Sequence, residues 1–566
     1  MKPIDDTLFP LDAEIPPDAR LVAPVEQDEY LLGGALRRWD GPRREVFSPV
    51  CVRQPGANAS GAQETIVAPA TEVDGMPGAA VSAGLFPVRI GSFPDMTAAA
   101  ALEVIEAAVV AWGQGRGPWP TLSVTERIRC VEEFAFRMTA RREEVVRLLV
   151  WEIGKTRRDA EREFGRTLEY IAGTVNALKD LDRSSSRFLV EEGILAQVRR
   201  APLGVVLCLG PYNYPLNETF TTLIPALIMG NTVVMKPPKL GVLLHRPLLD
   251  AFRDSFPPGV VNTVYGEGKQ ILGPLMASGK VDCLAFIGSH RVADLLKKQH
   301  PRPHRLRCVL GLDAKNPAII LPDADLDLAA RECLLGALSF NGQRCTALKI
   351  LFVHESVAAS FLTRLEAGID ALQPGMPWES DATLTPLPEP GKVAYLRELV
   401  ADAVALGARV TNPGGGQAVA TYFHPAVIFP VDARMRAWRE EQFGPVIPVA
   451  TFRDIEEPVR YIVESPFGQQ VSLFGGNPAT LSQLIDPLVN QVCRVNLNSQ
   501  CQRGPDSLPF TGRKDSAEGT LSMSDALRVF SIRTLVAAKD EAVNRRILGE
   551  ILRRRSSTFL STDFIF

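Results

Sequence analysis

The hydrophobic positions of the chain change their spacing along its length. From Met96 onward, apolar side chains recur at the spacing of one helix face, at Leu102, Ile105, Val109 and Trp112. Residues 123–150 and 157–180 repeat this pattern. We therefore predict a helical region that begins near Met96 and ends near residue 180.

From residue 203 the pattern becomes one of short apolar runs separated by helical segments. The strand-like runs are 203–209, 232–235, 260–264 and 283–287, with helical segments between them, for example at 241–255 and 268–278. A second alternation begins at Ala318 and continues through 325–340, 349–353, 356–372, 425–430 and 446–451. Such alternation predicts doubly wound parallel sheets, and therefore an α/β fold with two domains of this type.

The ends of the chain lack this alternation. Residues 1–95 are irregular apart from a short hairpin expected around Leu31–Gly34. Residues 54–95 are rich in Pro, Gly, Ala and Thr, which indicates an insertion or a linker. After residue 540 we expect a tail helix and a frayed end.

Composition and charge restrict the possible functions. The 62 Lys and Arg residues against 65 Asp and Glu residues argue against binding to nucleic acid or to an anionic membrane. No apolar run reaches the roughly 18 residues of a membrane-spanning helix, and residues 1–20 contain no apolar core of a secretory signal. Nine scattered cysteines indicate free thiols in a reducing compartment, so we expect a cytoplasmic protein. The six histidines show no metal-binding spacing, and no metal site is expected.

Two polar positions at the ends of apolar segments could carry chemistry. Cys345 follows an apolar helix at a glycine-containing break, where a turn can present a thiol to a cleft and Arg344 is expected to lower the thiol pKa. Taken alone, such a cysteine is more often structural. Asn213 follows the strand at 203–209, at the edge of the sheet where ligands bind, and its amide can donate two hydrogen bonds to an oxyanion.

Other strand ends carry groups suited to anions. Gly288 and Ser289 lie between a strand and a helix, which predicts an anion-binding helix N-terminus. Lys236 and Lys239 follow another strand, and their reach suits a phosphate or a ribose. The two prolines between these lysines keep the backbone extended.

These segments, taken in order, resemble the aldehyde dehydrogenase superfamily. The matching motifs are PYNYP at 211–215, GNTVVMKPP at 230–238, FIGS at 286–289, GQRC at 342–345 and EQFGP at 441–445. The resemblance extends from about Met96 to Asp540. Within the superfamily, the segments at 213–217, 342–347 and 502–510 are similar to the branch of non-phosphorylating, NADP-dependent glyceraldehyde-3-phosphate dehydrogenases.

The resemblance implies a fold and an assembly. It implies an aldehyde dehydrogenase-like α/β fold with a Rossmann-like cofactor domain, a catalytic domain and a β oligomerisation arm, in a homodimer or homotetramer. The expected segments are an N-terminal extension and insertion (1–95), an NAD(P)-binding domain (96–183 and 202–311), a catalytic domain (312–515), an arm (184–201 and 516–540) and a tail (541–566).

The resemblance also implies catalytic roles. Cys345 matches the nucleophile, which attacks the aldehyde carbon to give a thiohemiacetal. Hydride transfer to nicotinamide then leaves a thioester that water hydrolyses. Asn213 and the Cys345 backbone N–H match the groups that hold the oxyanion.

The cofactor positions follow in the same way. Lys236 matches a contact to the adenosine ribose or its phosphate, Gly288 and Ser289 match the pyrophosphate turn, Glu441 matches the contact to the nicotinamide ribose, and Phe443 packs beside it. Lys239 stands where NAD-preferring relatives often carry a glutamate for the ribose hydroxyls. A cation there favours a 2′-phosphate, so we expect NADP, with NAD possible.

Arginines suggest the charge of the substrate. Arg344 beside the nucleophile and Arg503 in the loop at the substrate mouth would suit a phosphate or a carboxylate, with a hydroxyl from Tyr214. Arg166 matches another anion contact. Surface or interdomain ion pairs are the alternative explanation for Arg166 and Arg503. The substrate expected is glyceraldehyde 3-phosphate or another anionic aldehyde, with no metal, nucleic-acid or membrane partner.

The sequence departs from the family at the general base. The segment that carries the family's base glutamate aligns here with residues 311–315, and the glutamate position is Gly311. Asp313 lies two residues further on and, in an extended segment, on the same side, so it is a candidate displaced base. Glu267 and Glu441 are other carboxylates that could approach. The loss of the glutamate leaves two alternatives: an acyl-transferring dehydrogenase, or a scaffold that binds cofactor and turns over slowly.

Overall fold

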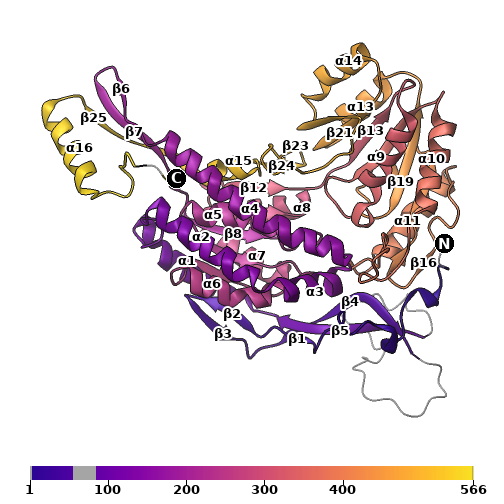
Figure 1. Cartoon of the computed structure of the whole chain (residues 1–566), viewed down its shortest axis with the longest axis horizontal. Coiled ribbons are helices and arrows are strands. Elements are labelled where there is room, and N and C mark those ends of the chain that lie inside the picture. The colour runs from indigo at the N-terminus through magenta and orange to yellow at the C-terminus, as the bar shows by residue number, and fades with distance from the viewer. Residues whose placement is uncertain (1–2, 55–83, 564, 566) are drawn as a thin grey trace.

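The computed structural model describes residues 3–54, 84–563 and 565. Two twisted sheets with helices packed on them lie next to each other, and an arm of strands projects from the first (Figure 1). Both sheets consist mainly of parallel strands, which confirms the predicted α/β class.

The first sheet is built from the apolar runs that begin at residue 203. Its order is β10 (Val261–Thr263), β9 (Thr232–Lys236), β8 (Val205–Leu209), β11 (Cys283–Ile287), β12 (Arg307–Gly311) and β24 (Ala517–Glu518). β8 is buried along its whole length, as expected for a parallel strand that has helices on both faces. The last strand, β24, is antiparallel and pairs Ala517 with Gly311.

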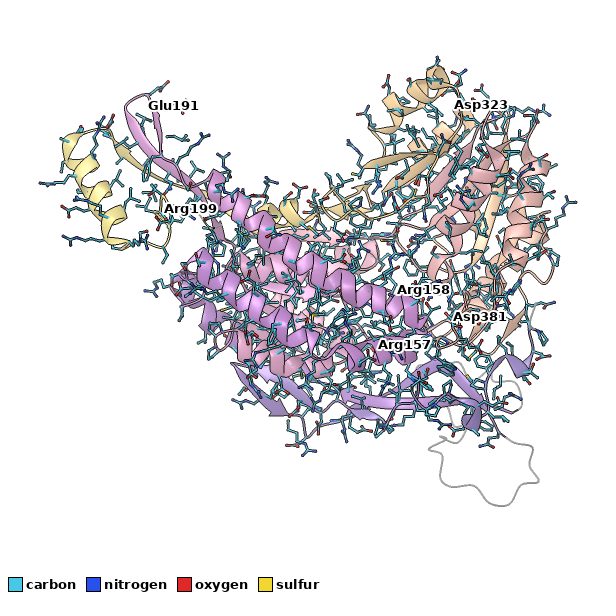
Figure 2. All side chains as sticks on the ribbon, viewed as in Figure 1. Arg157, Arg158, Glu191, Arg199, Asp323 and Asp381 are labelled. Carbon is cyan, nitrogen blue, oxygen red and sulfur yellow. The ribbon has the colours of Figure 1, made fainter. Side chains whose placement is uncertain are left out.

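Helices cover this sheet on both sides. They are α1 (Ala98–Trp112), α2 (Val124–Thr139), α3 (Arg142–Ile153), α4 (Arg157–Ser184), α5 (Asn217–Ile228), α6 (Leu249–Ser255), α7 (Gly268–Ala277) and α8 (His290–Gln299). The helical pattern over 123–150 is formed by two helices, α2 and α3, because the chain turns at Ala140 and Arg141. The long helix α4 runs from the arm toward the second domain, and Figure 2 shows Arg157 and Arg158 at that far end.

The second sheet has the order β15 (Arg409–Val410), β18 (Ala426–Phe429), β19 (Val446–Phe452), β14 (Leu348–His354), β13 (Asn316–Ile320), β21 (Gln470–Phe474) and β22 (Arg494–Leu497). Its helices are α9 (Leu326–Leu338), α10 (Ala358–Asp370), α11 (Lys392–Ala405), α12 (Arg436–Arg439), α13 (Glu456–Glu464) and α14 (Pro478–Leu488). α9 leads directly into the segment that carries Cys345.

The N-terminal region is more regular than its composition suggested. β2 (Glu29–Leu32) and β3 (Ala35–Arg38) form the expected hairpin, while β4 (Arg43–Arg53) and β5 (Leu85–Pro94) form an antiparallel pair with β1 (Val25–Glu26) at its edge. The interpretation of 54–95 as a linker is therefore wrong for 85–94. Prolines and Gly91 masked the strand pattern there, and the remainder of that segment, 55–83, lies outside the described residues.

The arm consists of β6 (Leu189–Glu191), β7 (Ile194–Pro202) and β25 (Ser531–Lys539), followed by α16 (Ala542–Arg554) (Figure 1). The expected second arm segment, 516–540, starts too early. Its first residues form β24 in the first sheet, and α15 (Met523–Val529) packs on α4 and α5. None of the helices described is long and apolar enough to cross a membrane.

Candidate active site

A cavity of about 1370 Å³ lies where the carboxyl ends of β8, β9, β11 and β12 face the second domain. Such strand ends are the usual ligand crevice of an open α/β sheet. The structure brings together here every residue predicted from the sequence to act in catalysis, cofactor binding or substrate binding. They are Arg166, Asn213, Tyr214, Lys236, Lys239, Gly288, Ser289, Asp313, Arg344, Cys345, Glu441, Phe443 and Arg503.

Cys345 follows a tight turn at the end of α9. Phe340 and Asn341 in this turn have φ angles of 51° and 53°, which non-glycine residues adopt rarely. Asn341 stabilises the turn by donating its side-chain amide to the Thr385 carbonyl at 3.0 Å. The Cys345 carbonyl accepts from Asn316 Nδ2 at 2.8 Å. Contacts from both sides of the turn therefore fix the backbone that presents the thiol.

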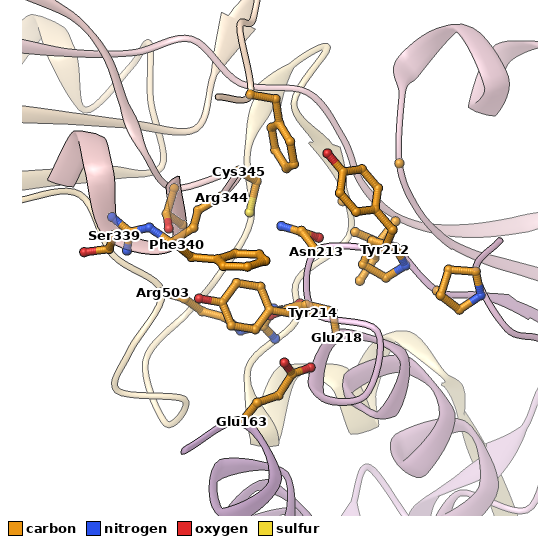
Figure 3. Close-up of a pocket in the computed structure, with 18 of the residues that line it drawn as sticks. Glu163, Tyr212, Asn213, Tyr214, Glu218, Ser339, Phe340, Arg344, Cys345 and Arg503 are labelled. Atoms are coloured by element: carbon orange, nitrogen blue, oxygen red, sulfur yellow. Dashed lines mark hydrogen bonds and ion pairs between the residues drawn. The ribbon is translucent and has the colours of Figure 1, made fainter. Parts of the chain in front are cut away.

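The charge environment of Cys345 differs from the sequence expectation. Burial raises the pKa of the thiol, and the Glu218 carboxylate raises it further. The Lys349 ammonium and the Arg503 guanidinium lower this pKa, but by less. The thiol pKa is therefore raised, and the expectation of a lowered pKa is wrong, because burial outweighs the nearby cations and the Arg344 side chain is turned toward Ser339 (Figure 3).

Asn213 lies four residues beyond the end of β8, in the loop that leads to α5. Figure 3 shows its side-chain amide and the Cys345 sulfur pointing into the same space. The amide nitrogen donates to the Gln343 carbonyl at 2.9 Å, which fixes its orientation. This arrangement leaves the second N–H of the amide as a donor beside the thiol.

Arg344 is bound to the end of α9. Its Nη2 donates to the Gly336 carbonyl at 2.8 Å and to the Leu335 carbonyl at 3.2 Å. A cation at a helix C-terminus interacts favourably with the helix dipole. In Figure 3 the side chain is turned toward Ser339. Its predicted contact with a substrate anion stays a prediction.

The other two arginines are paired with carboxylates. Arg503 is buried, and it forms ion pairs with Glu218 and Asp506. Arg166 makes a bidentate contact with Asp506, at 2.9 and 2.7 Å. Tyr214 packs edge-on against Phe340, and the centre of its ring lies 3.5 Å from the Lys155 ammonium. The ion pairs that were the alternative explanation for Arg166 and Arg503 are therefore present.

Lys349 is a functional candidate that the sequence reasoning missed. It lies in β14 and is 1% exposed, and its ammonium donates to the carbonyls of Cys345 and Ala314, both at 3.1 Å. It also pairs with Glu441, whose pKa is raised by burial. A lysine inside the apolar run 348–353 was the available signal, because a buried charge requires a partner.

The groups at the opposite end of the cavity suit a dinucleotide. Lys236 ends β9, and burial lowers its pKa to about 8. Among the described residues, its ammonium donates only to the Pro237 carbonyl, at 3.3 Å. Lys239 is exposed at the same edge, and Ser289 precedes α8, whose N-terminus faces the cavity. Two cations beside a helix N-terminus fit a phosphate-rich ligand.

The sequence matches the model of the aldehyde dehydrogenase family over residues 87–535. The chain belongs to the aldehyde dehydrogenase family. This confirms the resemblance that the motifs indicated. Phe443 and Glu441, at the cavity wall, lie within the matched segment, as does the turn that carries Cys345.

Curated relatives of this aldehyde dehydrogenase include NADP-dependent glyceraldehyde-3-phosphate dehydrogenases. The protein of that name from Streptococcus equinus is 32% identical over 465 residues, which are 80% of this chain and 92% of the relative. The one from Pisum sativum is 30% identical over 74% of this chain and 84% of its own length. Vanillin dehydrogenase from Pseudomonas fluorescens is 28% identical over 78% of this chain and 91% of its own length.

Solved structures show the same fold. NADP-dependent glyceraldehyde-3-phosphate dehydrogenase from Bacillus halodurans C-125, complexed with NADP, has a TM-score of 0.78 and 27% identity, covering 91% of this chain and all of the other. An NAD-dependent aldehyde dehydrogenase from Sinorhizobium meliloti has a TM-score of 0.79 and 25% identity, covering 94% and 97% of the two chains.

This aldehyde dehydrogenase has no carboxylate at the position expected for the general base. Gly311 ends β12 and lines the cavity. The Asp313 carboxylate accepts from the His290 backbone N–H at 2.7 Å and lies 2.6 Å from His290 Nδ1. It therefore caps the start of α8, and its predicted role as a displaced base stays a prediction. Glu267 pairs with Arg44 at 3.6 Å.

Proposed function

We propose that this protein oxidises an anionic aldehyde to its carboxylic acid with NADP through a covalent intermediate on Cys345. The observation that carries the proposal is the convergence of Cys345, Asn213 and Glu441 with the basic strand end at Lys236 in one cavity. A nucleophile, an oxyanion donor and a phosphate-binding edge are the parts that an aldehyde dehydrogenase needs.

The first step would take place at the sulfur. The Cys345 thiolate attacks the aldehyde carbon, and the free N–H of Asn213 stabilises the oxyanion that forms on the carbonyl oxygen. The pKa of this thiol is raised by burial, so its deprotonation depends on the cations around it. The Lys349 ammonium holds the Cys345 carbonyl at 3.1 Å, and thereby fixes the peptide that follows the nucleophile.

NADP, when bound, supplies the acceptor for the hydride of the thiohemiacetal carbon. Lys236 and Lys239 would hold its adenosine phosphate, Gly288 and Ser289 its pyrophosphate, and Glu441 its nicotinamide ribose, beside Phe443. The NADP-dependent relatives support this choice of coenzyme, and so does the cation at Lys239. NAD remains the second coenzyme to test.

The proposed substrate carries a negative charge. Arg166, Arg344 and Arg503 all line the cavity, and Tyr214 adds a hydroxyl. Glyceraldehyde 3-phosphate is the first compound to assay, because several relatives are named for its oxidation. The protein would act as a homo-oligomer in the cytoplasm.

A second candidate function differs only in how the acyl group leaves. Gly311 provides no base to activate water, and an acceptor thiol does not need that base. An acyl-transferring dehydrogenase would form a thioester product from coenzyme A. Product analysis with and without coenzyme A separates the two candidates. Free acid formed at an unchanged rate in both reactions would exclude acyl transfer.

The test of the main proposal is replacement of the nucleophile. Cys345→Ala should abolish NADPH formation from aldehydes and leave the dissociation constant of NADP within a few-fold, because the thiol forms the covalent bond but is not needed to bind the coenzyme. Cys493→Ala is the matched control, since Cys493 is exposed and outside the cavity. Retention of more than about a tenth of the rate in Cys345→Ala would refute the role of Cys345.

A further inference from the structure

At the inner end of the substrate cavity, two carboxylates, Glu218 and Asp506, balance the charges of Arg503 and Arg166. Arg503 uses all three of its nitrogens within the protein: on Glu218, on Asp506 at 3.2 Å and on the Leu521 carbonyl at 3.3 Å. Its guanidinium also lies 4.5 Å from the centre of the Phe510 ring. These contacts use three of the five guanidinium N–H donors, and the two carboxylates balance its charge, so Arg503 attracts a substrate anion only weakly.

Glu218 is one of these two carboxylates. It lies in the first turn of α5, five positions after Asn213, and is 7% exposed. Both members of its pair with Arg503 line the cavity, so Glu218 presents a negative charge to the space in front of Cys345. An anionic group near the aldehyde carbon would be repelled by this carboxylate.

The rim of the same cavity is positively charged. Arg158 and Arg162 on α4 line it and are exposed. They lie four residues apart, and Arg166 lies four further on, so the three share one face of the helix. Neither Arg158 nor Arg162 forms an ion pair in the part of the chain that the structure describes. The neighbouring Asp159 is the one rim carboxylate on this turn.

The charge of Arg158 does not stabilise the helix α4. It is the second residue of α4, where a positive charge opposes the helix dipole. Arg157, the first residue, is compensated by ion pairs with Glu143 and Glu161. Arg158 lies about 12 Å from Arg166 along the helix axis, at 1.5 Å per residue. At the α4 rim, the cavity therefore has two arginines, Arg158 and Arg162, that form no ion pair within the described residues.

We propose that Glu218 excludes short anionic aldehydes from the inner end of the cavity, and that Arg158 and Arg162 bind the anionic group of a longer substrate at the rim. The substrate class is then an aldehyde whose terminal anion is separated from the carbonyl by a long, uncharged chain. Tyr214, Phe340 and Phe510 provide the apolar wall between the two ends. This inference rests on the proposed function and revises its substrate: a short anionic aldehyde such as glyceraldehyde 3-phosphate would be excluded, because Arg503 is paired with Glu218.

The test compares acids with their methyl esters. The substrates are 4-oxobutanoate and 8-oxooctanoate, each with its neutral methyl ester, and the measurement is the ratio of kcat/KM for acid over ester with NADP. The wild type should give a ratio above one for the long pair and below one for the short pair. The opposite order, or equal ratios, would overturn the inference.

Two sets of variants test which residues cause the preference between acid and ester. Arg158→Gln with Arg162→Gln should lower the long-acid ratio about five- to thirtyfold, as expected for two partly exposed charge contacts. Arg157→Gln is the matched control, because it lies on the same turn but outside the cavity, and its ratio should not change. Glu218→Gln keeps the shape and releases Arg503, so it should raise the short-acid ratio about tenfold. No change in the rim variants or in Glu218→Gln would refute the assignment.

The two proposals fail in different ways. If neither esters nor acids are oxidised by the wild type with NADP, the proposed function is wrong. If esters are oxidised and the charge ratios do not depend on chain length, only the assignment of Glu218 and the rim arginines is wrong.

Discussion

Gly311 provides the most direct test of the second half-reaction. A Cβ atom at this position would lie 3.5 Å from Ile287 Cγ1, an ordinary contact, and the backbone φ is not in the left-handed region. A glutamate should therefore be accepted. Without it, deacylation should lag behind hydride transfer, since a positioned base contributes about 10²- to 10⁴-fold. Stopped-flow measurement should show an NADPH burst near one per site in the wild type, and a smaller burst with a faster steady rate in Gly311→Glu.

Asp313 supplies the control for this experiment. If its carboxylate acts as the displaced base, Asp313→Asn should lower the steady rate sharply and leave the burst intact. If it only holds His290, the steady rate should stay close to that of the wild type. A wild type without a burst would show that the missing glutamate does not limit turnover.

Lys236 should make coenzyme binding depend on pH. Burial lowers the pKa of its ammonium to about 8, so the free enzyme loses this cation as the pH rises through that value. The dissociation constant of NADP, measured by calorimetry between about pH 6 and 10, should therefore increase above about pH 8. Lys236→Met should bind more weakly and show a flatter profile. An equal pH dependence in wild type and variant would contradict the contact.

The sequence identified the residues of the cavity but not their partners. Cys345, Asn213 and Glu441 occur in recognisable motifs, and the α/β fold brings strand ends together, so their convergence could be predicted. The pairing of Arg503 with Glu218 joins residues 285 positions apart, and no local pattern encodes it. For the same reason, the raised pKa of Cys345 could not be predicted, because it depends on burial by distant segments.

At the scale of the elements, a buried ion pair joins α4 to the start of α5. Lys155, just before α4, and Glu163 within it are both fully buried. The Glu163 carboxylate accepts from the backbone N–H groups of Leu216 and Asn217, each at 3.1 Å. Glu163 therefore fixes the segment that follows Asn213, and the pair connects helix packing to the geometry of the oxyanion donor.

Breaking this pair should destabilise the protein strongly. Lys155→Met leaves a buried carboxylate without its cation, which typically costs about 3–5 kcal/mol. Denaturant unfolding monitored by circular dichroism should show a clearly lower midpoint. Arg157→Met is the control, because its ion pair with Glu161 is exposed and contributes about 0–1 kcal/mol. Similar midpoints for the two variants would show that the buried pair contributes little.

The helices and strands could be predicted where the hydrophobic pattern covers most of the element. The buried strands at 205–209 and 283–287 and the helix at 98–112 follow directly from their apolar patterns. The break at Ala140 was missed because the helical pattern continues on both sides of it. The two-residue strand β24 is too short to show a period, and only tertiary pairing defines it.

At the scale of the whole molecule, the arm exposes apolar side chains. Leu535 is 56% exposed, Leu189 44% and Ile194 37%, and the strand register places these three side chains on one face of the small sheet. A group of apolar residues on a projecting sheet is typical of an interface. We therefore expect a second copy of the chain to cover this surface.

Disruption of that surface should change the assembly. Leu535→Lys should lower the molar mass measured by light scattering after gel filtration, because it places a charge in the apolar contact. Val110→Lys is the matched control, since Val110 is 77% exposed but lies on α1, away from the arm. If the wild type has the mass of one chain, the arm does not mediate assembly under those conditions.

The late strand β24 has a consequence for biosynthesis. It covers the edge of the first sheet by pairing with Leu310 and Gly311 of β12, and it is made about 200 residues after them. At about 5–20 residues per second, the ribosome takes roughly 10–40 s to produce it. During that interval β12 has an unpaired edge that can bind another nascent chain. The emerging polypeptide is therefore most exposed to misassembly until β24 is translated, and chaperone capture should be greatest on ribosomes stalled between residues 311 and 517.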